Sequence, residues 1–380
     1  MTDEPETLGL YVHVPFCEAK CTYCHFAIDP RRPGEDRQER YLRALLAEMA
    51  AAEPGSADTL YFGGGTPSLM AAPRLGSLIA EARRRFDLAA DAEVTLEANP
   101  RDLGPAGYAD LLSRGVNRLS LGVQSFDDSV LRDMGRFHTA ADTRAAVRDA
   151  RQEGFSNVSI DLILGWPGET PERWERNLEV LAELTPEHVS LYVLEVEGKT
   201  VLTHRARRGA LGLPADDLVA DLYLRTAEAF AALGLDRYEI SNFARPGFGS
   251  RHNARYWADA PFLGFGMSAH SYRGGRRWWN RETYAGYCAA VEGGGAAAVA
   301  GSRTLSPDER VGEALFTGLR RRRGIDLREF RDRYGVDPLE RYGASLRDSI
   351  DAGLLASLDG RLFLTDRGTL VSSEVFAAFV

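Results

Sequence analysis

Residues 11–26 read Tyr-Val-His-Val-Pro-Phe-Cys-Glu-Ala-Lys-Cys-Thr-Tyr-Cys-His-Phe, and this stretch decides how the rest of the chain is interpreted. It holds three of the four cysteines of the protein, Cys17, Cys21 and Cys24, in the spacing C-x3-C-x2-C. Thiolates are soft ligands that suit iron–sulfur clusters. Three cysteines in one loop can bind three irons of a cubane, so the fourth iron stays open to a small molecule. We therefore expect a [4Fe–4S] cluster on this loop.

Two other uses of the cysteines remain open at this point. A structural zinc site usually takes four protein ligands, often as two separated cysteine pairs. The chain has no second pair, although His13 or His25 could supply one more ligand. A dithiol redox pair at Cys21 and Cys24 would leave Cys17 without a role. The spacing favours the cluster over both alternatives.

Six short apolar runs alternate with amphipathic stretches through the first two-thirds of the chain. We expect strands at residues 8–14, 59–62, 93–97, 118–123, 157–164 and 188–194, and helices at 37–52, 72–86, 105–113, 140–153 and 171–184. Repeated strand–helix units imply parallel strands with right-handed crossovers, which fits an open Rossmann sheet or a barrel. Chemically unusual residues fall at or after strand ends, where a parallel barrel builds its sites. The sequence thus predicts an α/β fold with a partial (β/α)6 barrel.

A glycine loop and two carboxylates stand at those strand ends. The run Leu60–Pro67 is a strand that stops in Gly63-Gly64-Gly65-Thr66, and such glycines expose backbone groups to a ligand. A simple tight turn would explain the glycines equally well. Glu97 and Asp161 lie within apolar strands, where an ionised acid is costly unless it is paired. We expect them to contact a ligand, with capping of a nearby helix as the alternative.

The last quarter of the chain has a different pattern. Residues 234–282 are rich in glycine, aromatic and polar residues and break the alternation, and residues 292–301 (EGGGAAAVAG) predict a linker. Helices are expected at 307–320, 327–334 and 338–352, and a hairpin at 354–364 with Asp359-Gly360 as its turn. We expect a core domain at residues 1–290 and a small, winged-helix-like α+β domain at residues 300–380.

Composition excludes several classes of partner. The net charge is −9, whereas a protein that binds nucleic acid usually carries a basic stripe, so no nucleic-acid partner is expected. The chain has no apolar run of about 18 residues, and its first residues have no pattern of a secretion signal. We expect a cytoplasmic protein whose membrane contact is at most peripheral.

The matching motifs resemble the oxygen-independent coproporphyrinogen III oxidase family of radical S-adenosylmethionine (SAM) proteins. The resemblance runs through residues 11–26, 61–68, 96–100, 122–127, 134–139, 161–168 and 191–195, and more weakly to the end of the chain. It implies the radical SAM barrel, a cluster on the three cysteines, and SAM as a second cofactor. The SAM contacts that it implies are Tyr11, Tyr23, Gly64, Gly65, Thr66, Glu97, Gln124, Arg136 and Asp161.

Two features separate the branches of that family. The oxidases carry a fourth cysteine where this chain has Phe26, and they have a longer segment before the cluster than the 16 residues that precede Cys17. The heme chaperone branch, of the HemW type, resembles this chain in its H-N-x-x-Y-W motif, which implies heme contacts by His252, Tyr256 and Trp257. Membership of this branch implies a chaperone that delivers heme to respiratory heme proteins. It implies no coproporphyrinogen oxidase activity, and we assign no catalytic residue.

Three points stay open on the sequence alone. By residue type alone, a loop histidine that bonds backbone carbonyls is favoured over a heme ligand at His252, and only the full motif of the resembling family reverses this preference. Coproporphyrinogen oxidation, or another radical SAM reaction on a tetrapyrrole, is the alternative function. A homodimer is possible, and the heme-accepting partner is not specified.

Overall fold

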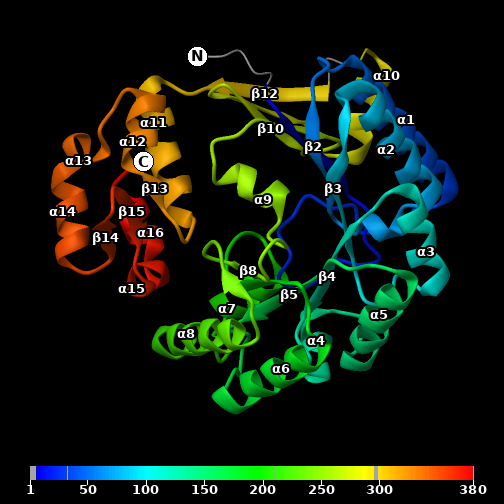
Figure 1. Cartoon of the computed structure of the whole chain (residues 1–380). Coiled ribbons are helices and arrows are strands. Elements are labelled where there is room, and N and C mark those ends of the chain that lie inside the picture. The colour runs from blue at the N-terminus through cyan, green and yellow to red at the C-terminus, as the bar shows by residue number, and fades with distance from the viewer. Residues whose placement is uncertain (1–5, 32, 210, 295–297, 380) are drawn as a thin grey trace.

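The computed structural model describes residues 6–31, 33–209, 211–294 and 298–379. Its centre is a curved sheet whose first six strands are parallel and lie in chain order. These strands are β1 (Leu8–Val14), β2 (Ala57–Gly64), β3 (Leu88–Ala98), β4 (Arg118–Gln124), β5 (Val158–Leu164) and β6 (His188–Val193). The predicted partial barrel of six strands is confirmed, and the sheet stays open rather than closing on itself (Figure 1).

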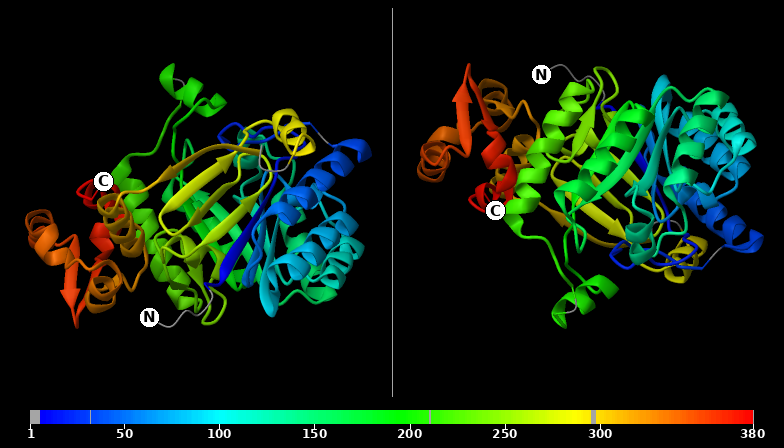
Figure 2. Two further views of the ribbon diagram at one scale, coloured as in Figure 1. Left: turned by 90° about the horizontal axis from the view of Figure 1, so that it is seen from above. Right: turned by 90° about the horizontal axis from the view of Figure 1, so that it is seen from below.

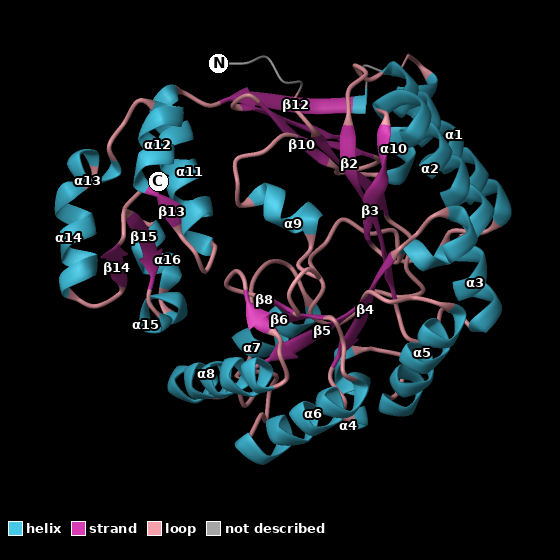
Figure 3. Cartoon of the chain, in the orientation of Figure 1, coloured by secondary structure: helices cyan, strands magenta, loops and turns pink. Residues whose placement is uncertain are grey.

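Helices cover the outer face of this sheet (Figure 3). They are α1 (Glu35–Ala51), α2 (Ala72–Phe86), α3 (Pro105–Arg114), α5 (Ala140–Glu153), α6 (Pro171–Leu184) and α8 (Asp216–Ala232). In α2, apolar side chains recur at helical spacing and are buried: Leu75, Leu78, Ile79, Ala82 and Phe86. Full burial of a large aliphatic or aromatic side chain contributes about 1.5–3 kcal/mol, so the outer layer holds the barrel in shape.

The inner face of the sheet is polar, because strand residues alternate between the two faces. Glu93, Thr95 and Glu97 lie on the inner face of β3, while Val94 and Leu96 belong to the apolar core under the helices. A short helix, α9 (Arg251–Tyr256), packs against this inner face. The carboxylate of Glu93 accepts hydrogen bonds from the backbone N–H groups of Arg251 and His252, at 3.0 and 3.1 Å, so it anchors the start of α9. The barrel is therefore filled by polar groups and a helix.

Residues 234–304 extend the sheet to twelve strands, which the sequence did not reveal. The added strands are β7 (Asp236–Arg237), β8 (Asn242–Ala244), β9 (Phe262–Phe265), β10 (His270–Arg273), β11 (Arg276–Asn280) and β12 (Val299–Thr304). The prediction of a linker at residues 292–301 is wrong for its last residues, because Val299 to Gly301 belong to β12 and pair with β11. Residues 295–297 of that linker lie outside the described residues.

Shorter elements connect the strands near the carboxyl ends of the sheet. They are η1 (Pro67–Leu69), α4 (Asp128–Met134), α7 (Val201–Arg207) and α10 (Tyr284–Glu292). The segment that carries α7, green in both views of Figure 2, projects away from the barrel.

The C-terminal part is a small α+β unit with its own apolar core. It contains α11 (Pro307–Arg320), β13 (Ile325–Asp326), α12 (Leu327–Tyr334), α13 (Pro338–Arg341), α14 (Gly343–Asp351), β14 (Leu355–Leu358), β15 (Arg361–Leu364), α15 (Asp366–Leu370) and α16 (Ser372–Phe376). The predicted hairpin is confirmed: Leu358 pairs with Arg361, and Asp359 and Gly360 both have positive φ, as a type I′ turn requires. The unit lies on the opposite side of the barrel from α1 to α3 (Figures 1 and 2).

Two residues next to α9 bind this unit to the barrel. The ring of Trp257 lies under the guanidinium of Arg320, with 4.4 Å from the ring centre to the guanidinium carbon. Asp259 accepts hydrogen bonds from Arg310, Arg333 and Tyr334. In the described residues, no helix is long and apolar enough to cross a membrane.

Candidate functional site

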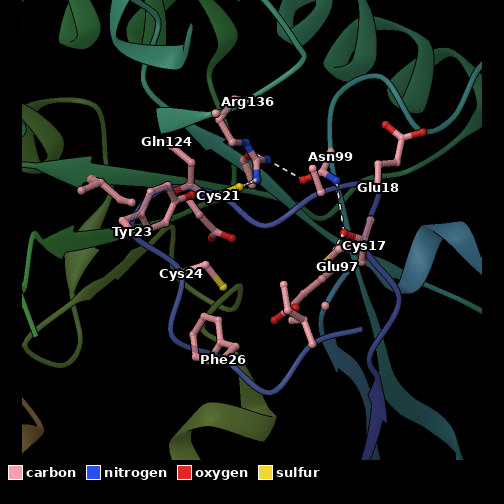
Figure 4. A pocket seen from close by; sticks show the side chains of 18 of the residues that line it. Cys17, Glu18, Cys21, Tyr23, Cys24, Phe26, Glu97, Asn99, Gln124 and Arg136 are labelled. Carbon is pink, nitrogen blue, oxygen red and sulfur yellow. Dashed lines mark hydrogen bonds between the residues drawn. The ribbon is translucent and has the colours of Figure 1, made fainter. Parts of the chain in front are cut away.

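A cavity of about 760 Å³ opens at the carboxyl ends of the parallel strands. The loop after β1 forms one wall, and the ends of β2 to β6 form the floor (Figure 4). All three cluster cysteines line it. Eight of the nine predicted SAM contacts line it as well: Tyr23, Gly64, Gly65, Thr66, Glu97, Gln124, Arg136 and Asp161. The residues predicted from the sequence are far apart in the chain, and the fold brings these eight together at one cavity.

Tyr11 is the predicted contact that does not line the cavity. Its ring stacks on Tyr61 with 6.2 Å between the ring centres, and its hydroxyl lies 3.0 Å from Nδ1 of His13. Tyr61 in turn donates a hydrogen bond to Glu97 at 2.7 Å. Tyr11 thus lies behind the cavity wall and supports residues that line it.

Backbone hydrogen bonds hold the cysteine loop in place. The N–H of Cys17 donates to the carbonyl of Asp29 at 3.2 Å, and the N–H of Thr22 donates to Met134 at 3.0 Å. The N–H of Leu202 on α7 donates to Thr22 at 2.8 Å. The loop is therefore tied to its own exit, to α4 and to α7, which fixes where the three thiols point.

The glycine loop packs directly against the segment that leads to the first cysteine. The N–H of Gly65 donates to Val14 at 2.8 Å, and the N–H of Thr66 donates to Phe16 at 2.7 Å. A Cβ on Gly64 would collide with the ring of His13, and one on Gly65 would lie 2.7 Å from the backbone of Pro15. Gly64 also has φ of 110°, which side chains other than glycine rarely adopt. Close packing of two loops, and not only turn geometry, requires these glycines.

The three thiols have different surroundings. Sγ of Cys17 lies 3.5 Å from the hydroxyl of Thr66, and Nη1 of Arg136 lies 3.7 Å from Sγ of Cys21. Burial raises the pKa of Cys17 to about 11 and also raises the pKa of Cys24. The thiols of Cys17 and Cys24 therefore hold their protons at neutral pH in the absence of a metal, and a bound metal would displace those protons.

The arrangement of donors fits a cluster better than a single metal ion. Among the described residues, no three His, Cys, Asp or Glu side chains converge on a point where one ion could bind. A cubane does not need such convergence, because each cysteine binds a different iron. The buried cation of Arg136 beside Cys21 also suits thiolate ligands. The cysteines therefore fit a [4Fe–4S] group.

Two buried carboxylates form the floor of the cavity. Glu97 accepts from the hydroxyl of Tyr61 at 2.7 Å and from the N–H of Gly64 at 3.2 Å. Asp161 accepts from the hydroxyl of Ser120 at 3.1 and 3.3 Å. Burial raises the pKa of Glu97 to about 7 and raises the pKa of Asp161 as well. Their remaining lone pairs face the cavity, where they can accept hydrogen bonds from hydroxyl groups of a ligand.

Arg118 is a buried cation beneath these acids, and sequence reasoning missed it. It begins β4, pairs in register with Thr95 of β3, and is 1% exposed. No carboxylate of the described residues lies within ion-pair distance of it, and its Nε has no hydrogen-bond partner among them. Its charge opposes the effect of burial on the pKa of Glu97 and Asp161. Arg118 is the first residue of β4, RLSLGVQ, where polar and apolar residues alternate, and the sequence holds no clear signal that it is buried.

Arg136 and Asn99 connect the cysteine loop to the sheet. Arg136 donates to Oδ1 of Asn99 at 2.5 Å and to the carbonyl of Gly122, and Nδ2 of Asn99 lies 3.4 Å from the hydroxyl of Thr66 (Figure 4). Asn99 was not predicted as a site residue, although it follows Glu97 by two positions. Gln124 ends β4 with φ of 68°, an unusual backbone conformation for a residue with a side chain.

The predicted heme contacts lie outside the cavity. The ring of His252 is 1% exposed, with Nδ1 2.9 Å from the hydroxyl of Thr59 and Nε2 2.8 Å from the hydroxyl of Tyr256. Burial lowers the pKa of His252 to about 3. Trp257 faces Arg320 of the C-terminal unit. Heme ligation by His252 would therefore require α9 to leave the barrel.

Apolar side chains at the rim of the cavity are exposed. Phe26 is 60% exposed and Phe137 is 57% exposed, and Tyr192 and Val193 are each 45% exposed. All four line the cavity. Clustered exposed apolar groups around a concave site are typical of a surface that another molecule covers.

Comparisons with known proteins agree with this geometry. The radical SAM superfamily matches residues 11–181, and the HemN C-terminal domain matches residues 305–371. Heme chaperone HemW of Mycobacterium tuberculosis (strain H37Rv) is 38% identical over 379 residues, covering 97% of this chain and 94% of that protein. Heme chaperone HemW of Bacillus subtilis (strain 168) is 36% identical, covering 97% and 98%.

Among solved structures, coproporphyrinogen III oxidase (HemN) of Escherichia coli, a radical SAM enzyme, superposes with a TM-score of 0.84 at 25% identity. The alignment covers 99% of this chain and 90% of that one. The likeness thus includes both the barrel and the C-terminal unit.

Proposed function

We propose, for a chain that belongs to the heme chaperone HemW family of radical SAM proteins, that it binds heme and passes it to heme-accepting proteins. The observation that carries this proposal is the full-length match to heme chaperones, which extends over 94–98% of two relatives and includes both domains. Phe26, in place of a fourth cysteine, agrees with it. Respiratory heme proteins are the class of recipient that we propose.

The radical SAM fold implies a [4Fe–4S] cluster and SAM, and the chain has residues to hold both. Cys17, Cys21 and Cys24 would hold the cluster, which supplies one electron at low potential when it is bound. Glu97 and Asp161 would accept hydrogen bonds from ribose hydroxyls, and the backbone of Gly64 and Gly65 would face the amino-acid part of SAM.

The other predicted SAM contacts would complete that pocket. Tyr23 packs edge-on against Trp166, with 5.9 Å between ring centres, and offers a fixed apolar wall. Thr66 and Gln124 offer polar groups next to the carboxylates, and Arg136 holds the cysteine loop against β4. Tyr11 would act from behind the wall through Tyr61. In this proposal SAM and the cluster are bound cofactors of the protein, and heme is the ligand that it delivers.

Heme titration of the anaerobically reconstituted, full-length protein tests the proposal. We expect one equivalent of hemin to bind with and without SAM, and to transfer to an apo-cytochrome of b type, followed by the absorbance of that acceptor. A protein that retains cluster and SAM binding but shows no affinity for heme would end the proposal.

Coproporphyrinogen III oxidation is the second candidate, and the superposition on the Escherichia coli oxidase favours it. An anaerobic assay with coproporphyrinogen III and SAM separates the two functions. Protoporphyrinogen formation would favour the oxidase, whereas SAM cleavage without this product would exclude it. A cytoplasmic location, peripheral membrane contact, a homodimer and the absence of nucleic-acid binding stay predictions.

A further inference from the structure

Asp133, near the end of α4, accepts hydrogen bonds from three other segments of the chain. Its Oδ2 accepts from Nε1 of Trp166 at 3.0 Å, and its Oδ1 accepts from Nη1 of Arg205 on α7 at 2.9 Å. Its backbone carbonyl accepts from the hydroxyl of Thr22 at 3.1 Å. One residue that does not line the cavity therefore joins α4 to the cysteine loop, to the loop after β5 and to α7.

Trp166 is the partner of Asp133 that lies directly behind the cavity wall. Its side chain is 2% exposed, and its ring packs edge-on against Tyr23, with 5.9 Å between the ring centres and 81° between the ring planes. Tyr23 lines the cavity together with the three thiols, whereas Trp166 does not (Figure 4). The orientation of the Tyr23 ring at the cavity thus depends on the ring behind it.

The indole N–H of Trp166 has to find an acceptor, because a buried donor without a partner is costly. In the part of the chain that the structure describes, the carboxylate of Asp133 is the acceptor that it finds. A carboxylate is a stronger acceptor than a neutral carbonyl. The other neighbours of Trp166 are apolar, among them Val130, Met134 and Leu202. Asp133 therefore decides how the indole ring is turned within this apolar cluster.

The two remaining bonds of Asp133 have different consequences. The ion pair with Arg205 is about two-fifths exposed on both sides, and exposed pairs contribute little to stability. The bond from Thr22 goes to a backbone carbonyl, so a change of the Asp133 side chain does not remove it. The N–H of Thr22 also donates to Met134 at 3.0 Å. A substitution at Asp133 thus leaves the cysteine loop attached to α4 and acts mainly on Trp166.

We infer that Asp133 is a positioning residue for SAM, and that it acts by holding Trp166 behind Tyr23. The inference rests on the proposed binding of SAM next to Tyr23. A wall that is held in its bound orientation beforehand spares the ligand the entropic cost of ordering it. Because Asp133 does not line the cavity, its effect reaches SAM through the packing of the two rings.

The test uses the full-length, anaerobically reconstituted protein, with SAM as the probe. Six proteins are compared: wild type, Asp133→Ala, Asp133→Asn, Trp166→Phe, the double variant Asp133→Ala/Trp166→Phe, and Arg205→Ala as the control for the ion pair. Calorimetry measures the affinity for SAM, and iron and sulfide analysis measures the cluster content. The electron paramagnetic resonance spectrum of the reduced cluster, with and without SAM, reports whether SAM reaches the iron.

We expect Asp133→Ala and Trp166→Phe to bind SAM at least fivefold more weakly, with wild-type cluster content and with the wild-type spectral change at saturating SAM. Asp133→Asn keeps an acceptor for the indole N–H, so its affinity should stay within twofold of wild type. Arg205→Ala should also stay within twofold. The double variant should bind no more weakly than the weaker single variant, because both substitutions remove the same bond.

Wild-type affinity in Asp133→Ala would overturn the inference and leave the proposed function intact. An equal loss in Arg205→Ala would also overturn it, since the ion pair would then be the cause, and so would additive losses in the double variant. If Asp133→Ala does not retain its cluster, Trp166→Phe decides, because it keeps an aromatic ring behind Tyr23 and lacks the donor. Wild-type affinity in that variant would then refute the inference. A wild-type protein with an intact cluster and no affinity for SAM would overturn both the inference and the proposed SAM site, whereas a failure to bind hemin alone would overturn only the proposed function.

Discussion

Nη1 of Arg136 lies 3.7 Å from Sγ of Cys21, so a buried cation touches one of the three thiols of the loop. The same side chain reaches Asn99 and Gly122 at the ends of β3 and β4. The cysteine loop and the floor of the cavity are therefore coupled through one guanidinium. A substitution that moves the cysteine loop is therefore expected to shift Arg136 and its contacts with Asn99 and Gly122.

Alanine at Cys17, Cys21 or Cys24 is expected to abolish the brown absorbance that follows anaerobic reconstitution. Each thiol would hold a different iron, so the loss of one removes a ligand that nothing nearby replaces. Cys288→Ala is the matched control, because Cys288 is buried in α10 and does not line the cavity. Full iron and sulfide content in any of the three loop variants would contradict the assignment.

Arg118→Met is expected to weaken SAM binding about tenfold at neutral pH. Arg118 opposes the effect of burial on the pKa of Glu97 and Asp161, so its loss favours their protonated forms. Calorimetric SAM titrations across a pH series check this, and affinity should recover as pH rises. Arg118→Lys should retain most of the affinity. Arg114→Met, at an exposed ion pair on α3, is the control and should change nothing.

Glu48 is expected to make the protein less stable as pH rises. It accepts hydrogen bonds from Gly266, Asn280 and Tyr287, yet burial raises its pKa from 4.5 to about 7. The folded state then holds the proton more tightly than the unfolded state between these values, so stability is greatest at the acidic end of this window. It falls by about 1–3 kcal/mol as pH rises through 7.

Glu48→Gln should flatten this dependence, as measured by denaturant unfolding in a series of buffers. Glu292→Gln, at an exposed ion pair with Arg40, is the comparison and should leave the slope unchanged. A wild-type protein whose stability does not depend on pH in this window would refute the role of Glu48.

Arg320→Ala is expected to loosen the C-terminal unit and to lower the free energy of unfolding by about 3 kcal/mol. The substitution removes the cation above Trp257 and the ion-pair partner, 3.7 Å away, of the fully buried carboxylate of Glu239. Thermal unfolding and limited proteolysis near residue 305 measure the effect. Arg328→Ala, at a highly exposed pair, should cost less than about 0.5 kcal/mol. Glu239→Gln in the Arg320→Ala background should recover part of the loss.

Much of the barrel was predictable because its strands are apolar on one face and its helices have regular apolar spacing. β1 begins and ends at the predicted residues, and the predicted hairpin turn at Asp359-Gly360 is present. The cavity residues were predictable because parallel strands end at one edge, so residues after different strands meet there.

The rest depended on contacts between distant segments. β8 pairs with β6 and β9 pairs with β1, which lie far away in the chain, so no local pattern marks how these short strands join the sheet. β10 and β11 form a local hairpin around Gly274-Gly275, which the sequence analysis did not identify. The position of His252 could not be read from its motif, because its burial depends on Thr59 of β2 and on Glu93 of β3. Arg118 was overlooked because an arginine at a strand start is usually exposed.

Helix α9 blocks the barrel from below, and this sets a sequence of events at the mouth. The cavity lies at the carboxyl ends of the strands, so a ligand enters it from that side of the barrel. A ligand bound at the mouth of the cavity would lie over a SAM molecule bound at its floor. We therefore expect a bulky ligand at the mouth to slow the dissociation of SAM that is already bound.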